Sequence, residues 1–200
     1  MKLAKNSTAW ISVPIFLTAA LAIAGSWYMS AVALVGFIFM IFFHRDPDRL
    51  PHGDGMVSPA DGRIIQATPE KITVFMGAYD VHVNRAPLNG TVEFLTYNPG
   101  KFISAFKDKA SDENESIFAG IKGEGGKVRV SVKFIAGLIA RRIVFYKQIN
   151  DMVKQGERIN MIRFGSRVNI FCPVDSTIAV KSGDKVTAGQ TVIAILKKGS

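Results

Sequence analysis

The sequence predicts a mainly β protein of the α+β class, in which a compact β-rich domain follows an N-terminal helical hairpin. Two observations lead to this prediction. The stretch from Trp10 to Phe43 holds no charged residue, whereas the chain after residue 55 breaks into short apolar runs between glycine- and proline-containing turns. Such runs are typical of strands. We therefore expect a membrane-anchoring segment over 1–43, a linker over 44–55 and the β-rich domain over 56–200.

The uncharged stretch is long enough for two short helices. As one helix its 34 residues would extend roughly 51 Å, whereas the hydrocarbon core of a bilayer is about 30 Å thick. Ala24–Ser30 contains a glycine, two serines and two aromatic residues, which suits a turn at a membrane interface. We therefore expect a membrane helical hairpin, or a hairpin that enters the bilayer only in part.

Basic residues flank the apolar stretch on both sides. Lys2 and Lys5 precede it, and Arg45 and Arg49 follow it. Because cytoplasmic segments carry an excess of Lys and Arg, both ends are expected on the cytoplasmic side of the cell membrane. The net charge of +9 also favours an anionic partner, such as a phospholipid surface, a nucleic acid or a phosphorylated substrate.

Turn residues divide the rest of the chain into strand candidates, and Lys127–Val132 alternates in the manner of a half-buried strand. Lys107–Ser116 is polar and is expected to be an exposed loop. Leu138–Tyr146 fits either a short helix or a strand. The expected strands are Met56–Ser58, Gly62–Ala67, Lys71–Met76, Val81–Asn84, Thr91–Tyr97, Ile117–Ile121, Lys127–Phe134, Ile159–Phe164, Val168–Phe171, Ser176–Val180 and Thr191–Leu196.

The cysteine and histidine content predicts neither a disulfide nor a metal site. Cys172 is the only cysteine, so an intramolecular disulfide is impossible. His44, His52 and His82 are scattered along the chain, and Cys172 has no potential ligand at the spacing of a zinc site.

The peptide between Gly165 and Ser166 joins two strand candidates. Because glycine accepts backbone angles that other residues resist, this peptide can be held bent. The Ser166 hydroxyl lies next to the Gly165 carbonyl, and its attack there would turn the amide into an ester. Elimination and hydrolysis would then leave a pyruvoyl group in place of Ser166. Gly-Ser is also common in turns and β-bulges, so the dipeptide alone leaves both interpretations open.

Three further residues are candidates for a site. Asp61 lies in the turn sequence Ser58–Gly62, where it either bonds its own turn or orients a catalytic base. His82 is the only histidine in a strand candidate, so it is either structural or a proton carrier near neutral pH. Arg85 has a planar guanidinium that suits a phosphate or carboxylate, which makes it a tentative substrate-binding residue.

Four motifs together resemble the phosphatidylserine decarboxylases, which are made as proenzymes that cleave themselves to generate a pyruvoyl group. The resemblance covers nearly the whole chain and is closest to the short, membrane-bound bacterial form. The motifs lie in the family's order and spacing behind an apolar segment. They are Phe42–Pro47, Val57–Gly62, Asp80–Pro87 and Arg163–Ser166.

The resemblance implies a role for each candidate residue. Ser166 becomes the pyruvoyl precursor, which forms a Schiff base with the substrate, and Gly165 supplies the carbonyl of the cleaved bond. Asp61 matches the aspartate of the family motif, and His82 matches the first histidine of a His-x-x-His pattern in longer members. Arg85 stands where those members have the second histidine, so the base for self-cleavage stays open.

The resemblance also implies a function. The chain would convert phosphatidylserine to phosphatidylethanolamine and carbon dioxide at the cell membrane. Its pyruvoyl ketone would take up the electrons left at Cα, and His82 is the candidate that returns a proton to that carbon. The two cleaved chains, 1–165 and 166–200, would remain associated.

Other functions remain open. Archaetidylserine, an ether-lipid analogue, carries the same serine head group. Val180–Gln190 is similar to the return strand of lipoyl and biotinyl domains, which predicts barrel-sandwich features. A non-catalytic, membrane-tethered lipoyl/biotinyl-like module is therefore an alternative, although no lysine motif lies at the matching hairpin tip. Nucleic acid is not an expected partner, because the chain has few of the basic-aromatic clusters that single-strand binders use.

Overall fold

The computed structural model describes residues 2–51, 53–101, 113–137, 143–163 and 165–196. The chain forms two compact units, Met1–Asp48 and Arg49–Ser200, which we call the hairpin unit and the β domain. The division falls inside the stretch 44–55 that was expected to be a linker. The prediction of a mainly β protein with an N-terminal pair of helices is confirmed.

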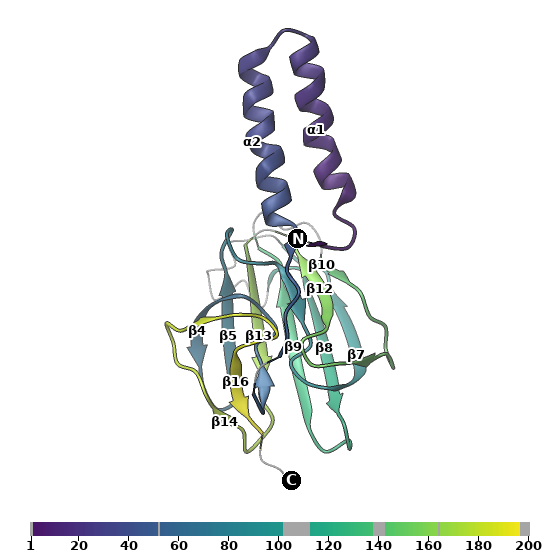
Figure 1. Ribbon diagram of the computed structural model, residues 1–200. Helices are drawn as coiled ribbons and strands as arrows, with labels where there is room; N and C mark the ends of the chain where they lie inside the picture. The colour runs from purple at the N-terminus through teal and green to yellow at the C-terminus, as the bar shows by residue number, and fades with distance from the viewer. Residues whose placement is uncertain (1, 52, 102–112, 138–142, 164, 197–200) are drawn as a thin grey trace. The chain divides into compact units, whose positions relative to one another are not determined.

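The hairpin unit consists of two helices and one short ladder (Figure 1). Helix α1 (Thr8–Ile23) and helix α2 (Trp27–Phe43) run in opposite directions and are joined by a turn at residues 24–26, in which Gly25 has a φ of 75°. Strands β1 (Lys2–Leu3) and β2 (Arg45–Asp46) pair where the hairpin begins and ends. No helix among the described residues is long and apolar enough to cross a membrane.

The β domain holds antiparallel ladders in three sheets. The largest has eight strands in the order β11-β7-β8-β9-β13-β5-β4-β15, and the others have the orders β10-β12-β6 and β14-β16-β3. The strands are β3 (Met56–Val57), β4 (Gly62–Ala67), β5 (Lys71–Met76), β6 (Val83–Arg85), β7 (Gly90–Asn98), β8 (Ser116–Gly123), β9 (Arg129–Ile135), β10 (Ile143–Phe145), β11 (Met152–Val153), β12 (Arg158–Ile162), β13 (Ser166–Phe171), β14 (Thr177–Ile178), β15 (Lys185–Val186) and β16 (Val192–Ile195).

These strands agree closely with the expected ones. Strands β4 and β5 have the predicted bounds. In the ambiguous stretch Leu138–Tyr146, the described part forms strand β10, while 138–142 lies outside the described residues. Most of the expected loop Lys107–Ser116 also lies outside them. The eight-stranded sheet has β11 at one edge and β15 at the other, so among the described residues this strand order does not close into a barrel. The likeness to lipoyl and biotinyl domains stays a prediction.

The core lies between the sheets. On β9, Val132 and Phe134 are fully buried while Lys133 between them is half-buried, as the alternating pattern requires. The ring of Phe134 meets that of Phe145 on β10, with centroids 6.0 Å apart. This contact joins the eight-stranded sheet to the sheet β10-β12-β6. Strand β13 begins at Ser166 and lies inside the large sheet, between β9 and β5.

Candidate active site

Gly165 and Ser166 lie where the chain enters β13. Gly165 has a φ of 60°, in the left-handed region that favours glycine, so the predicted bend is present. Ser166 pairs with Met76 on β5 and is fully buried. Its Oγ has no hydrogen-bond partner among the described residues. Because a buried polar atom without a partner costs free energy, such an atom in a native protein calls for an explanation, and a catalytic role is one.

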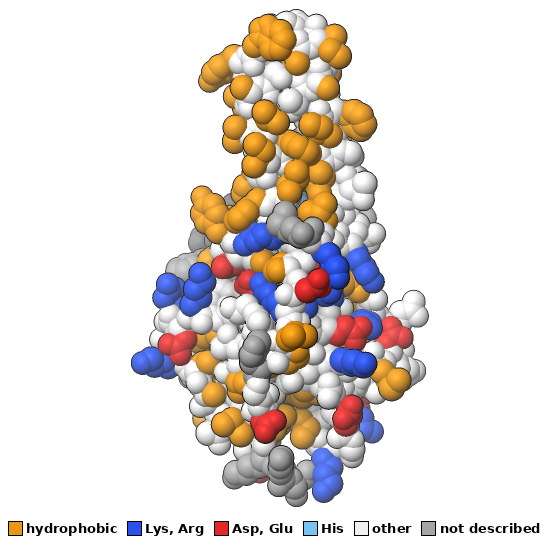
Figure 2. All heavy atoms as spheres, viewed as in Figure 1, with side chains coloured by type: hydrophobic (Ala, Val, Ile, Leu, Met, Phe, Trp, Pro, Cys, Tyr) orange, Lys and Arg blue, Asp and Glu red, His pale blue; other side chains and the backbone are white. Residues whose placement is uncertain are grey.

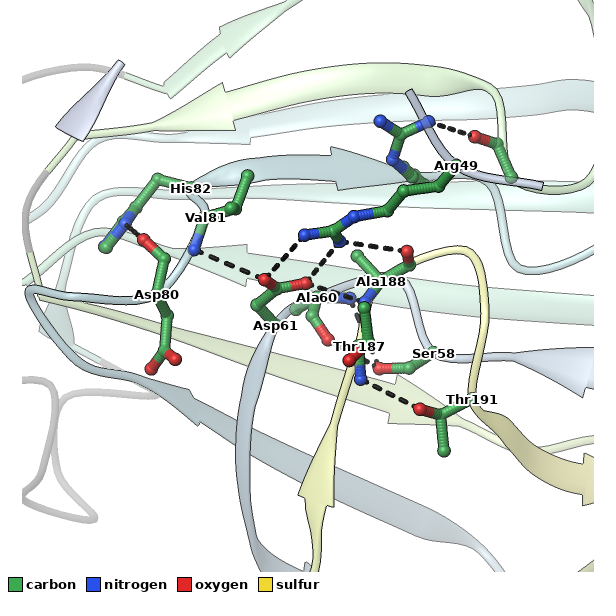
Figure 3. A network of polar contacts seen from close by, with 12 residues as sticks. Arg49, Ser58, Ala60, Asp61, Asp80, Val81, His82, Thr187, Ala188 and Thr191 are labelled. Carbon is green, nitrogen blue, oxygen red and sulfur yellow. Dashed lines mark hydrogen bonds and ion pairs between the residues drawn. The ribbon is translucent and has the colours of Figure 1, made fainter. Parts of the chain in front are cut away.

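The Asp61 carboxylate accepts four hydrogen bonds (Figure 3). Arg49 donates to it from both terminal nitrogens, from Nη1 to Oδ1 at 2.5 Å and from Nη2 to Oδ2 at 2.8 Å. The backbone amide of Ala188 donates to Oδ1 at 2.7 Å, and that of Val81 donates to Oδ2 at 3.4 Å. Three distant segments therefore meet at Asp61, which is not a turn aspartate that bonds only its own backbone.

Asp61 is connected to His82 through the backbone of Val81. Val81, which Asp61 binds, directly precedes His82. The buried His82 ring contacts the Asp80 carbonyl through Nδ1 at 2.9 Å. Since a carbonyl only accepts, Nδ1 carries a proton, and Nε2 is the basic atom of the neutral ring. Asp61 thus contacts the backbone next to His82, and no hydrogen bond in the described part of the chain joins it to the Ser166 hydroxyl.

His82 is connected to the segment that leads to Ser166. The backbone amide of Ile162, the last residue of β12, donates to the His82 carbonyl at 3.2 Å. Only three residues separate Ile162 from Ser166. The structure therefore brings the His82 backbone to the strand that ends just before the predicted cleavage point.

Arg85 faces the interior of the β domain. Its side chain is 2% exposed, and its Nη1 donates to the Gly156 carbonyl at 2.8 Å. Its Cδ lies 2.7 Å from where a Cβ on Gly189 would stand, so Gly189 must lack a side chain here. The tentative assignment of Arg85 to substrate binding gains no support from this geometry.

Sequence reasoning missed Arg49, which it treated as a basic flank of the apolar stretch. Arg49 instead forms the ion pair with Asp61, and both side chains are largely buried, at 8% and 13% exposure. No local pattern indicates a partner twelve residues away across a turn-rich segment.

A hollow of about 330 Å³ opens beside the turn that carries Asp80. Arg63 and Lys185 line it from paired positions on β4 and β15, and the exposed Tyr79 lines it from the turn. An anion that entered this hollow would meet two cations and one acidic residue, Asp80, close to the His82 segment.

Cys172 is unsuited to be an alternative nucleophile. Burial raises the pKa of its thiol to about 11. A thiol with so high a pKa is almost wholly protonated near neutral pH, and the thiolate is the reactive form.

The sequence also matches known proteins. A family model described as phosphatidylserine decarboxylase matches residues 68–194, more than half of the chain. The chain belongs to the phosphatidylserine decarboxylase family. The resemblance predicted from the four motifs is thereby confirmed, and with it the class of the enzyme, since phosphatidylserine decarboxylases are carboxy-lyases.

Relatives of this family cover nearly the full chain. A protein of Methanosarcina barkeri (strain Fusaro / DSM 804), provisionally named an archaetidylserine decarboxylase proenzyme, is 43% identical over 207 residues, with 98% of this chain and 100% of that protein covered. The phosphatidylserine decarboxylase proenzyme of Symbiobacterium thermophilum is 40% identical over 191 residues, which cover 89% of this chain and 88% of that protein. The phosphatidylserine decarboxylase proenzyme of Oleidesulfovibrio alaskensis is 44% identical over 189 residues, which cover 88% of this chain and 86% of that protein.

The Asp61–Arg49 pair predicts a stability effect. Asp61→Asn leaves a largely buried guanidinium without its counter-charge, which costs about 3–5 kcal/mol of the free energy of unfolding. It should also slow self-cleavage, because the freed backbone of His82 would hold Ile162, and with it the strand that leads to Ser166, less firmly. Urea unfolding is measured in the Ser166→Ala background, where the chain stays whole, and cleavage is followed by gel electrophoresis in the Ser166 protein.

Asp184→Asn is the matched control for this prediction. The Asp184 carboxylate accepts a local bond from the Lys181 amide at 2.9 Å. Asp184 is half-buried, and substitutions away from buried networks usually change stability by roughly 0.5 kcal/mol or less. Equal effects of the two substitutions would contradict the role given to the Asp61–Arg49 pair.

Proposed function

We propose that this chain is a self-processing, pyruvoyl-dependent decarboxylase that converts phosphatidylserine to phosphatidylethanolamine and carbon dioxide in phospholipid biosynthesis. The observation that carries the proposal is the buried Ser166 hydroxyl, which has no hydrogen-bond partner in the described part of the chain and directly follows a Gly165 with a φ of 60°. Membership of the phosphatidylserine decarboxylase family supports it. So does the name proenzyme, which its bacterial relatives bear.

Ser166 supplies both the nucleophile and the atoms of the cofactor. Its Oγ bonds to the carbonyl carbon of Gly165 while the Gly165–Ser166 C–N bond breaks, so the amide becomes an ester. Loss of the Ser166 Cα proton then breaks the Cβ–Oγ bond and leaves Gly165 with a free carboxylate. Water replaces the nitrogen of residue 166, which leaves as ammonia, and a pyruvoyl group remains. No described atom outside the neighbouring residues lies within 4 Å of a Cβ built on Gly165, so the peptide has room for this rearrangement.

The pyruvoyl group supplies an electron sink for the carbanion that decarboxylation leaves, which ordinary side chains do not provide. The protein's own residues must position the substrate and return a proton. His82 is the candidate proton donor. The Asp80 carbonyl holds its Nδ1–H, so Nε2 must first take up a proton from solvent before the imidazolium returns one to Cα. Arg63 and Lys185 are better placed than Arg85 to attract an anionic head group.

The two cleaved chains should stay associated. Strand β13 would belong to the fragment 166–200, and both of its neighbours, β5 and β9, would belong to 1–165. Strands β15 and β16 of the small fragment pair in the same way with β4 and β3. Separation would break four ladders and expose the core.

We further propose that the hairpin unit binds the membrane, with the β domain on the cytoplasmic side. Helices α1 and α2 carry no charged residue, and their surface in Figure 2 shows hydrophobic side chains without the Lys, Arg, Asp and Glu side chains that lie elsewhere in this view. The exposed apolar side chains include Phe16, Ile23, Trp27, Tyr28 and Val35, each at least two-thirds exposed. So large an exposed apolar surface indicates contact with lipid or with another protein. The basic flanks and the hydrophobic character of both helices favour lipid.

Removal of the hairpin tests the membrane proposal. A chain that begins at Asp46 keeps Arg49 and should leave the membrane fraction. In the full chain, Val35→Asp places a charge among the lipid tails at a cost of about 2.5–3.5 kcal/mol and should weaken membrane association. Met152→Asp, at a still more exposed position of the β domain, is the control and should have no effect. Vesicle flotation measures the membrane association of the shortened chain and of both variants.

Topology is tested separately by protease accessibility. Both flanks of the hairpin should be cleaved from the cytoplasmic side. Protection of the Arg45 side alone would rule out the hairpin topology.

Archaetidylserine is a second candidate substrate, because relatives provisionally named for that activity are 43% and 44% identical to this chain. The purified protein should release labelled carbon dioxide from a serine phospholipid, and diacyl and diether lipids compared side by side will identify the backbone. A non-catalytic lipoyl/biotinyl-like module would release none from either lipid.

A further inference from the structure

Two buried asparagines face each other between β6 and β12. Asn84 and Asn160 are paired across the ladder, and both are fully buried. The Asn84 Nδ2 donates to the Asn160 Oδ1 at 2.6 Å. The other two amide atoms, Asn84 Oδ1 and Asn160 Nδ2, have no hydrogen-bond partner within the described ranges. The pair therefore presents one unused acceptor and one unused donor inside the protein.

A structural role does not explain this arrangement. A buried amide atom without a partner costs roughly as much as a hydrogen bond contributes, so two such atoms outweigh the single bond between the side chains. If both amides were turned over, one donor and one acceptor would still remain unused. Two apolar side chains of the same size would suit the core better, unless a bound water or ligand completes the bonds.

The pair lies on the same face as His82. Ile162 donates its amide to the His82 carbonyl, next to the paired Asn84 and Asn160. His82 directly precedes β6 and lies two residues before Asn84, and its carbonyl bond to Ile162 continues the ladder with β12; residues two apart on a strand point to the same side. The amides and the imidazole therefore project from one side of this small sheet.

The same side faces the start of β13. Asn160 also pairs with Phe145, whose ring centroid lies 6.0 Å from that of Phe134. Phe134 pairs with Val168, and Val168 follows Ser166 by two residues on the same face of β13. The asparagine pair and the Ser166 hydroxyl thus project into one interior.

We propose that Asn84 and Asn160 bind the serine head group in the mature enzyme. This inference rests on the proposed function. The Asn160 Nδ2 would donate to the α-carboxylate, and the Asn84 Oδ1 would accept from the α-nitrogen, two groups carried by one carbon atom. The carboxylate loses its charge as carbon dioxide leaves, so an ion pair to a cation would stabilise the substrate more than the transition state. A neutral amide orients the carboxylate with less of this penalty.

The pair also gives discrimination between substrate and product. Phosphatidylethanolamine has no α-carboxylate, so it would leave the Asn160 donor unpaired again. A site built to hydrogen-bond a group rejects the analogue that lacks it. The product would therefore bind more weakly than the substrate and leave the site.

The test is the double variant Asn84→Leu/Asn160→Leu, which keeps side-chain size and removes both unused polar atoms. It should self-cleave and be at least as stable as the wild type. Its kcat/KM for phosphatidylserine should fall on the order of 10- to 100-fold, the scale of lost hydrogen bonds to a charged group. The ratio of the product inhibition constant to KM should fall toward one.

Asn114→Leu is the matched control. Asn114 is also buried, but its amide donates to the Ala136 carbonyl at 2.7 Å, so its replacement should lower stability and leave the inhibition ratio unchanged. Asn160→Asp is a second variant that keeps the shape and the acceptor for Asn84, and its carboxylate should repel that of the substrate and raise KM.

Three results would overturn the inference. A double variant with wild-type kcat/KM would refute it while the proposed function stands. Loss of self-cleavage in both the double variant and Asn160→Asp would assign the pair to folding or maturation instead. Failure of the wild type to release carbon dioxide would refute the inference and the proposed function together.

Discussion

Ser166→Ala should remain a single full-length chain and should release no carbon dioxide above background. Alanine lacks the oxygen that attacks the Gly165 carbonyl, so neither the ester nor the pyruvoyl group can form. The expected loss of activity is on the order of 10⁶-fold, the scale measured when a catalytic nucleophile is removed from a protease. Intact mass and carbon dioxide release from serine-labelled lipid measure the two parts of this prediction.

Ser116→Ala is a suitable control. Ser116 is also buried, at 1% exposure, and also begins a strand of the eight-stranded sheet. This variant should cleave and turn over like the wild type. Cleavage in Ser166→Ala, or failure of both variants, would remove Ser166 from its proposed role.

His82→Ala should still cleave itself but should decarboxylate poorly. The imidazole returns a proton to Cα in the proposed reaction, and a general acid is typically worth about 10²–10⁴-fold in rate. A gel follows cleavage, and labelled carbon dioxide follows turnover. His82→Gln is a second variant that keeps a polar side chain at this buried position.

His44→Ala is the control for the histidine variants. The His44 ring also contacts a backbone carbonyl through Nδ1, that of Met40 at 2.9 Å, but it belongs to the hairpin unit. If His82→Ala abolishes cleavage, His82 is the base that replaces the second histidine of longer members, and the proposed division of labour is wrong. If His82→Ala has normal turnover, His82 has no part in the chemistry.

Local patterns predicted most of the fold. The turns at 123–126 and 181–184 and the alternation in β9 depend on neighbouring residues, so the sequence displays them directly. Strands β11 and β15 were missed, because a two-residue strand has no periodicity of its own. Their pairing with β7 and β4 is a tertiary effect.

The candidate site was predictable only in part. The bend at Gly165 follows from the freedom of glycine, which a sequence shows. The partner of Asp61 and the facing amides of Asn84 and Asn160 depend on which distant segments meet, and no local signal encodes that. The charge of Arg85 suggested that it binds an anionic substrate. In the structure its guanidinium donates a hydrogen bond to the Gly156 carbonyl.

The intact mass of the purified wild-type protein, before and after borohydride reduction with substrate, tests the central claim most directly. The account predicts two chains, 1–165 and 166–200, with a pyruvoyl group at the start of the small chain. Reduction in the presence of a serine phospholipid should add the mass of the amine-bearing lipid to that chain alone. A single full-length chain in a preparation that decarboxylates the lipid would contradict the account.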